Sequence, residues 1–295
     1  MGKKQRAIRL QAEIYQQFDA DISLDVPGEA YGGWKTIPVE LPLERTALVS
    51  MHTWSFDPPE KIMGLFHAVE YLGRADRIMG TAYPRLLSAV RKARMPLFHV
   101  VGGKSYFRDF PGYKRTVKLA GPAPQASPGA PRDPAVAALN KLRIKHGFPG
   151  EHNLKDIDVA HNAVSFPPEA RPLDTEPIAE NAHQLNAICR EHGVSHLVYV
   201  GFAINWCILM SPGGMMEMSR LGYLCSTIRE CTTAVENKET ARRELCKQLA
   251  LWRVSLAFGL VFGLDNFVAA LQKLSDKRGA KGKRGRSPKS RSSSR

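Results

Sequence analysis

The sequence predicts an α/β protein in which one parallel β-sheet is covered by helices on both faces. Short, mostly apolar runs such as TALVSM and LVYV alternate along the chain with longer segments of helical periodicity. A buried parallel strand is typically a continuous apolar run of about four to eight residues bounded by turn residues. Because strands that alternate with helices favour a doubly wound sheet, we expect a single doubly wound α/β domain.

The first half of the domain supplies two strands and one helix. Apolar residues fill the predicted strands, Thr46 to Met51 and Pro96 to Val101. Between them, Ala75 to Lys92 places apolar side chains on one face of a helix. Residues 102–150 are rich in glycine, proline and charge, so we expect a long loop there. Loops of this length are usually lids, interface arms or disordered segments.

The second half repeats the alternation of strands and helices. Its predicted strands are Ile157 to His161, Leu197 to Gly201, Tyr223 to Ile228 and Gly259 to Gly263. Its predicted helices are Ile178 to His192, Lys238 to Ala257 and Asp265 to Leu274. With the first half, these elements define a domain over residues 44–275.

We interpret residues 1–43 as an N-terminal extension that could pack over a neighbouring subunit or the mouth of a site. Its segment Ile8 to Phe18 is expected to form a short amphipathic helix, followed by a connector rich in glycine and proline. The first residues lack the apolar core of a signal peptide. Arg253 and Asp265 interrupt the longest apolar stretch, Leu251 to Leu271, so we expect no membrane partner. A soluble, cytoplasmic protein is predicted, or a nuclear one in a eukaryote.

The formal net charge of +14 is concentrated at the C-terminus. Residues 277–295 carry nine lysines and arginines and no acid, which leaves +5 on the rest of the chain. This segment has no apolar residue larger than alanine, so residues 276–295 are predicted to be a disordered tail. Its charge favours non-specific binding of nucleic acid, although it could equally be a solubilising tail.

The five cysteines point to a reduced protein. Their number is odd, no CxxC pair is present, and none is closely spaced with histidines. This pattern argues against a disulfide framework and against a structural zinc site. We expect no metal and no cofactor.

One stretch, His196 to Cys207, has the pattern of a catalytic nucleophile. An apolar strand runs through Gly201 into a sharp turn and delivers a cysteine to the start of a helix. Ligands of open α/β sheets bind outside the carboxyl ends of the strands. A helix N-terminus favours thiolate over thiol, so Cys207 is a candidate nucleophile. The alternative is that Cys207 is a small buried hydrophobe.

The segments GFAINWCILM and RLGYLCSTIRECTTA resemble the nucleophile region of the isochorismatase-like cysteine hydrolases, which include nicotinamidases and N-carbamoyl amidohydrolases. The positions that match are Gly201, Ala203, Asn205, Cys207, Gly222 and Tyr223. Ile204 replaces the usual hydroxyl residue. The resemblance covers residues 44–275 and implies a sheet of about six parallel strands, an oligomer and a catalytic set of aspartate, lysine and cysteine.

The aspartate that the resemblance implies is missing from the end of the first strand. Aligned on the run that starts at Arg45, its position falls on His52; aligned on Phe56, it falls on Met51. We prefer His52, because that register rests on four consecutive matches. Histidine is a suitable base for a cysteine nucleophile. His52 could also be an ordinary strand-end histidine.

The lysine that the resemblance implies is missing as well. Its position falls on Ala160 or, one residue along, on His161, and Lys155 lies before the predicted strand. His161 could supply a second ionisable group to the site, or could be a strand-end histidine with no catalytic role. His99 lies inside a predicted strand, and the metal-binding histidines of nicotinamidases have no counterpart.

The turn itself would supply the oxyanion hole and the pocket wall. The resemblance implies backbone amides of Ile204 and Cys207 as oxyanion donors, with a cis peptide bond after Ala203. The pocket residues are expected to be Met51, Trp54, Ala203, Asn205 and Trp206, and the two tryptophans favour a flat or apolar substrate. Pro212 should end the helix that follows Cys207 after one or two turns.

Three functions compete on this evidence. The first is a hydrolase of a carbon–nitrogen bond in a small-molecule amide, acting through a Cys207 thioester with His52 as base. The second is a catalytically inactive binding or scaffold protein whose basic tail engages nucleic acid. A vinyl ether hydrolase of the isochorismatase type is the third, and the absence of an aspartate on the first strand counts against it.

Overall fold

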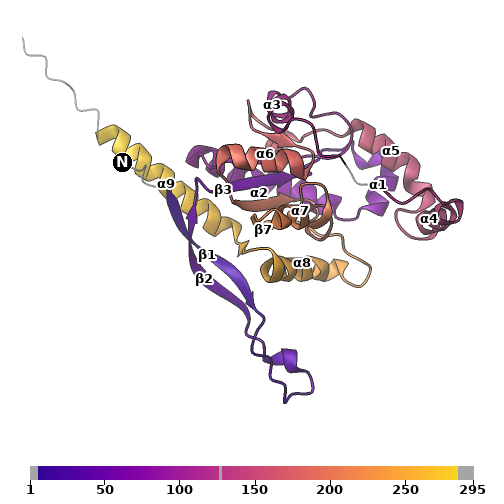
Figure 1. Ribbon diagram of the computed structural model, residues 1–295, viewed down its shortest axis with the longest axis horizontal. Helices are drawn as coiled ribbons and strands as arrows, with labels where there is room; N and C mark the ends of the chain where they lie inside the picture. Colours follow the sequence, from indigo (N-terminus) through magenta and orange to yellow (C-terminus); the bar gives the residue numbers. More distant parts are fainter. Residues whose placement is uncertain (1–5, 126–127, 285–295) are drawn as a thin grey trace, which may run out of the picture.

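The computed structural model describes residues 6–125 and 128–284, with side chains described up to Asp276. Eight strands form one sheet in the order β2-β1-β8-β7-β6-β3-β4-β5 (Figure 1). The strands are β1 (Ala7–Gln16), β2 (Gly33–Pro42), β3 (Thr46–Met51), β4 (Leu97–Val100), β5 (Ile178–Ala179), β6 (His196–Gly201), β7 (Leu224–Thr232) and β8 (Val261–Phe262). The six strands from β8 to β5 pair in parallel, which confirms the predicted α/β fold.

Nine α-helices accompany the sheet in the described part of the chain. They are α1 (Met63–Ala68), α2 (Leu72–Ala93), α3 (Pro111–Ala120), α4 (Pro134–His146), α5 (Leu154–Ala163), α6 (Ala182–His192), α7 (Met215–Arg220), α8 (Leu245–Ala257) and α9 (Leu264–Arg284). Helices α2 and α9 pack on one face of the sheet, and α6, α7 and α8 pack on the other. Each face therefore has its own apolar core, as expected for a doubly wound sheet.

The elements built from long apolar runs follow the prediction closely. Strand β3 has the predicted limits, β6 begins one residue early, and α2 begins three residues before Ala75. Alternate β3 residues point to opposite cores, with Leu48 toward α2 and Val49 toward α6. Burial on both faces explains why such a strand is mostly apolar along its whole length.

The N-terminal helix predicted over Ile8 to Phe18 is wrong. Residues Ala7–Gln16 form β1, which pairs antiparallel with β2 along its whole length and with β8 at Ala12 and Glu13. Apolar residues alternate with polar ones here, and Ile8, Leu10 and Ala12 are buried. That period of two is a strand pattern. The extension thus adds a hairpin to the parallel sheet, and its far end projects from the body (Figure 1).

The long loop predicted for residues 102–150 contains two helices, α3 and α4. Both begin at a proline, Pro111 and Pro134, where the missing N–H costs nothing. The Asp133 carboxylate caps α4 by accepting from the backbone N–H of Ala135 at 2.7 Å. In this segment, proline therefore marks the start of each short helix, and glycine follows its last residue.

Two other predicted elements are of the wrong type or length. Ile157 to His161 lies in α5, not in a strand, because Ile157 and Ala160 pack at helical spacing on the apolar cluster around α1. The helix predicted from Ile178 begins at Ala182, where the Asn181 side chain accepts from the N–H of Gln184 at 2.9 Å. Residues 178–179 form the edge strand β5 instead.

The C-terminal elements also differ in their limits. Strand β7 continues to Thr232, β8 is reduced to Val261 and Phe262, and a 3₁₀ turn at Ala241–Arg243 precedes α8. The backbone of α9 continues to Arg284, past the predicted end. Residues 285–295 of the predicted tail lie outside the described residues. Within the described residues, no helix is long and apolar enough to cross a membrane.

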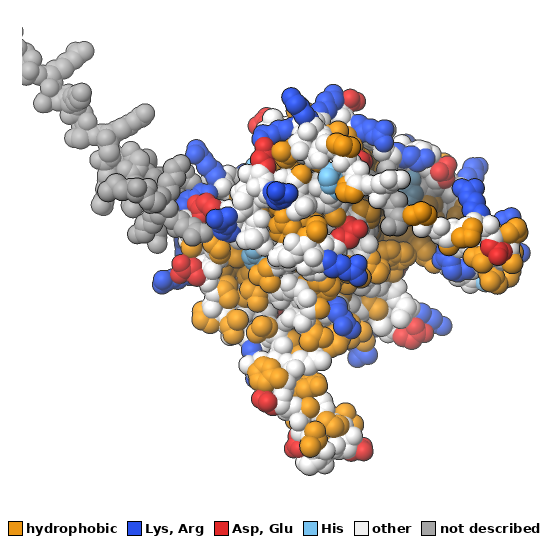
Figure 2. All heavy atoms as spheres, in the orientation of Figure 1, with side chains coloured by type: hydrophobic (Ala, Val, Ile, Leu, Met, Phe, Trp, Pro, Cys, Tyr) orange, Lys and Arg blue, Asp and Glu red, His pale blue; other side chains and the backbone are white. Residues whose placement is uncertain are grey.

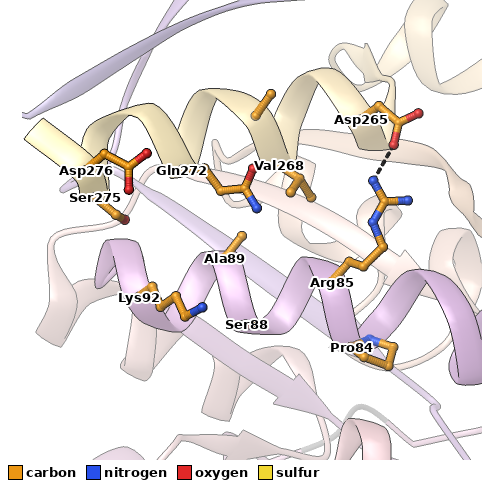
Figure 3. Close-up of a pocket in the computed structure, with 11 residues that line it drawn as sticks. Pro84, Arg85, Ser88, Ala89, Lys92, Asp265, Val268, Gln272, Ser275 and Asp276 are labelled. Atoms are coloured by element: carbon orange, nitrogen blue, oxygen red, sulfur yellow. Dashed lines mark hydrogen bonds and ion pairs between the residues drawn. The ribbon is translucent and has the colours of Figure 1, made fainter.

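A surface groove of about 850 Å³ runs between α2 and α9 (Figure 3). Its walls carry charges of both signs, and the Arg85 guanidinium donates to the Asp265 carboxylate at 2.5 Å. Lys92 and Asp276 lie farther along it. The groove contains no cysteine or histidine among the described residues, so its size alone does not make it a reaction site.

Candidate functional site

The nucleophile turn follows β6 at the carboxyl edge of the parallel strands. Cys207 lies in a single π-helical turn, Ile204–Ile208, a conformation often found at functional sites. Only a glycine fits at the end of β6. Gly201 has a φ of +131°, and a Cβ there would lie 1.9 Å from the carbonyl oxygen of Met51. This close approach fixes the turn against the end of β3.

Hydrogen bonds tie the same turn to the segment that follows β7. The Asn205 side chain donates to the carbonyl of Val235 and accepts from its N–H, both at 2.8 Å. The cis peptide bond lies between Phe202 and Ala203, so it precedes Ala203 and does not follow it. Asn205 therefore has a positioning role, and Ala203 is fully buried beneath the turn.

Cys207 lines a cavity of about 280 Å³ whose wall is mostly apolar. Four aromatic side chains contribute to it: Trp54, Tyr71, Phe148 and Trp206. The rings of Phe148 and Trp206 are 5.2 Å apart, and both are partly exposed, so they form an aromatic lip. No carboxylate, lysine or arginine lines the cavity among the described residues.

The electrostatics of Cys207 differ from the expectation based on a helix dipole. Burial raises the pKa of its thiol, and the Ser211 hydroxyl offsets only part of this rise. The π-helical turn is five residues long, so its dipole is small beside the cost of desolvating a thiolate. The resting nucleophile is therefore a neutral thiol, and attack requires a proton acceptor.

His52 lies at the end of β3 but is not among the residues that line the cavity. Its ring stacks on Trp54 with 4.6 Å between centroids, and only 7% of the residue is exposed. Burial lowers the pKa of His52 to about 4. Trp54 thus separates His52 from the apolar cavity, and Met51 is buried in the core below.

Buried neutral histidines should make stability depend on pH. Burial lowers the pKa of His52 and of His196 to about 4. Below about pH 6.5 the unfolded chain therefore binds protons that the folded chain does not, so this stability is present above that pH and is lost as the pH falls toward 4. We expect each imidazole to lower the free energy of unfolding by about 2 kcal/mol between pH 7 and pH 5.

Urea unfolding at pH 7 and pH 5 measures this loss. His196→Gln should remove the part of this loss that His196 causes. The ring of His196 is hydrogen-bonded to the Ser226 hydroxyl at 2.8 Å. The exposed His152 provides the control, because His152→Gln should leave the loss unchanged. An equal pH dependence in wild type and His196→Gln would contradict the assignment.

His161 lies on α5 and lines the cavity together with Cys207. Its ring contacts Trp54 edge to face, with 6.3 Å between centroids. Burial lowers the pKa of His161, and Asp158 raises it by a smaller amount. His161 is therefore mostly unprotonated near neutral pH, which is the state needed to accept a proton. In the described residues no hydrogen bond joins it to Cys207.

The two amides predicted to form the oxyanion hole have different surroundings. The N–H of Ile204 donates to the carbonyl of Thr233 at 2.8 Å, so it is already occupied. It could receive an oxyanion only if that hydrogen bond opened. Cys207 itself lines the cavity, so its amide is the remaining candidate of the two donors.

Sequence reasoning missed Tyr71 and Phe148. Tyr71 precedes α2 and has a phenol whose pKa is raised by burial. Phe148 follows α4 in a segment predicted to be a loop. Both are far from Cys207 in the sequence, and neither lies in a local sequence pattern that marks a pocket residue.

His99 belongs to a buried ion-pair network. Its ring nitrogen lies 3.0 Å from a carboxylate oxygen of Glu176, which also accepts from the Arg91 guanidinium at 2.8 and 2.9 Å. Burial raises the pKa of Glu176, but the hydrogen bonds from Arg91 and His99 outweigh it and give a pKa of about 2. In the part of the chain that the structure describes, no group of histidines, cysteines and acids is arranged to hold a metal ion.

Comparison with known proteins gives structural likeness at low identity. The chain is 12% identical to a cysteine hydrolase from Pseudomonas syringae, over 79% of this chain and 95% of that one, with a TM-score of 0.44. It is 14% identical to an N-carbamoylsarcosine amidase from Thermoplasma acidophilum, over 75% of this chain and 97% of that one, with a TM-score of 0.39. It is 16% identical to an isochorismatase family protein from Burkholderia thailandensis, over 78% of this chain and 96% of that one, with a TM-score of 0.38. No family model matches the chain, and no curated protein matches it.

Proposed function

We propose that this protein is a thiol-dependent hydrolase of small, uncharged apolar amides or esters, with Cys207 as nucleophile. The observation that supports it most directly is that a thiol and an unprotonated imidazole line the same apolar cavity. His161 takes the role of proton acceptor that the sequence alone suggested for His52. At the low identity and TM-scores above, this proposal rests on the residues of the chain itself.

The reaction would proceed through a thioester. The proton of the Cys207 thiol passes to the His161 imidazole, directly or through one water, as the sulfur attacks the carbonyl carbon. The carbonyl oxygen becomes an oxyanion that the Cys207 amide stabilises. The imidazolium returns its proton to the leaving amine or alcohol as the C–N or C–O bond breaks. Water then hydrolyses the thioester, giving a carboxylic acid and the free thiol.

The wall of the cavity defines the class of acyl group. Trp54, Tyr71 and Trp206 contribute aromatic side chains, and the described lining has no lysine or arginine that could pair with a substrate carboxylate. Burying an unpaired charge in such surroundings is costly, so anionic substrates should be excluded. A volume of about 280 Å³ suits an acyl group of a few carbons or a single ring.

Two p-nitrophenyl esters of similar size test the proposal. We expect the uncharged butyrate to be hydrolysed at least about tenfold faster than the anionic hydrogen succinate, because the cavity has no partner for the second carboxylate. His161→Asn should lower the butyrate rate by roughly a hundredfold. The wild-type rate should fall only below about pH 6.5, as the imidazole becomes protonated.

The exposed His152 again supplies the matched control, since His152→Asn should keep the wild-type rate and pH profile. Equal rates for the two esters would contradict the apolar substrate class. A normal rate in His161→Asn would remove His161 from the mechanism.

Two observations favour a second candidate, a binding protein without catalysis. The described lining of the cavity lacks a carboxylate and a lysine, and burial raises the pKa of the thiol. Under this alternative, the butyrate ester would bind and compete with other apolar ligands but would not turn over. The basic tail could then engage nucleic acid, as the sequence suggested.

A further inference from the structure

Two exposed apolar segments of opposite charge project from the body of the protein. One is the hairpin tip, residues 17–32 between β1 and β2, and the other is α4 (Figure 1). Figure 2 shows apolar side chains gathered at the end of the hairpin. We propose that the hairpin tip of one copy packs on α4 of a second copy, and that the two copies exchange tips in a two-fold dimer.

The hairpin tip is apolar and acidic. Its exposed apolar side chains are Phe18, Ile22, Leu24 and Val26, and Ile22 is 91% exposed. It also contains four acids, Asp19, Asp21, Asp25 and Glu29, and no lysine, arginine or histidine. None of these acids forms an ion pair in the part of the chain that the structure describes. Such a tip fits a surface that is apolar and basic.

Helix α4 has that complementary character. Val136, Leu139 and Leu142 are more than half exposed. The helix also carries Lys141, Arg143 and Lys145, and no acid. These cations form no ion pair among the described residues. The two segments therefore match in both apolar character and charge.

The surroundings of α4 support a partner of this kind. None of its residues is buried, although it spans thirteen residues. A helix of about this length is marginal in water without tertiary packing, and an apolar helix usually has its side chains covered. A tip from a second copy would supply the missing packing.

Two-fold symmetry explains why one surface of each kind is enough. In a two-fold dimer, each tip contacts the partner's α4, so both tips and both helices are covered and the assembly closes. The reciprocal contact also doubles the buried area, which must reach about 1,200 Å² in total for a stable interface. Helix α4 leads through Gly147 to Phe148, so the docked tip would lie beside the aromatic lip.

Exchange of charges between the two segments tests the proposal in the full-length protein. A tip variant with Asp19→Lys, Asp25→Lys and Glu29→Lys, or a helix variant with Lys141→Glu, Arg143→Glu and Lys145→Glu, should each weaken dimerisation at least about tenfold. Combining the two sets makes the tip basic and α4 acidic, which restores opposite charges, and should return the dissociation constant to within about threefold of wild type. Sedimentation equilibrium at several protein concentrations measures these constants.

Apolar variants provide an independent arm of the same experiment. Ile22→Ser and Leu139→Ser should weaken the dimer, whereas Leu249→Ser, at a side chain 61% exposed on α8, should not. Unchanged thermal midpoints would show that each variant is folded. A wild-type chain that stays monomeric, charge reversals without effect, or a combined variant that stays dissociated would each overturn the proposal.

Discussion

Replacement of Cys207 by alanine is expected to abolish hydrolysis of p-nitrophenyl butyrate, with a loss of at least about a thousandfold. The thioester route has no other nucleophile in the cavity, because His161 and Tyr71 are its remaining titratable groups in the described structure. The rate should fall in kcat and not through weaker binding, since alanine leaves the aromatic wall intact. Initial rates at saturating ester measure the effect.

Cys246 supplies the matched control for this substitution. It is half-buried on α8, near the Thr240 hydroxyl at 3.3 Å, and it does not line the cavity. Cys246→Ala should keep the wild-type rate. A Cys207→Ala protein that retains more than roughly a tenth of the activity would contradict the role of the thiol.

Replacement of Gly201 by alanine is expected to be the most damaging small substitution in the fold. A Cβ at this position would overlap the Met51 carbonyl, and the φ of +131° is strained for any residue with a side chain. We expect a loss of about 3 kcal/mol or more in the free energy of unfolding. Urea unfolding at pH 7 measures this loss.

A second glycine provides the control for the loss of stability expected in Gly201→Ala. Gly80 lies inside α2 with an ordinary helical backbone, and a Cβ added there would enter open space. Gly80→Ala should stabilise the protein by about 0.5–1 kcal/mol. Equal stability changes in the two variants would contradict the close approach between β6 and β3.

The parallel part of the sheet could be predicted because burial on both faces leaves an unmistakable sequence pattern. Thr46–Met51 and His196–Gly201 are continuous buried runs, and the same pattern extends to their neighbours. The amphipathic face of α2 was equally clear, since one side of that helix packs on the sheet. The local sequence is enough to predict such elements, because each of their buried side chains points into an apolar core.

The errors arose where a short pattern supports two structures. Over Ile8 to Phe18 the apolar residues are compatible with a helix as well as with a strand, and pairing with β8 decides the outcome. Ile157 to His161 is apolar enough for a strand, but its contacts with α1 make it helical. In both cases the deciding partner is distant in the sequence.

The site was predicted in part for the same reason. Cys207 could be found because its turn, from Gly201 to Asn205, is local and specific. Trp54, His161 and Trp206 were also named from the sequence, whereas Tyr71 and Phe148 come from segments that only the fold brings to the cavity. The role of the basic tail and the oligomeric state stay predictions.

The most direct test of the thioester mechanism is the mass of the protein after brief exposure to p-nitrophenyl butyrate and quenching in acid. We expect one butyryl group on the wild-type chain, mapped to Cys207 by peptide mass spectrometry. His161→Asn should acylate much more slowly, and Cys246→Ala should acylate like wild type. Butyrylation spread evenly over the five cysteines, or none at Cys207, would contradict the proposed function.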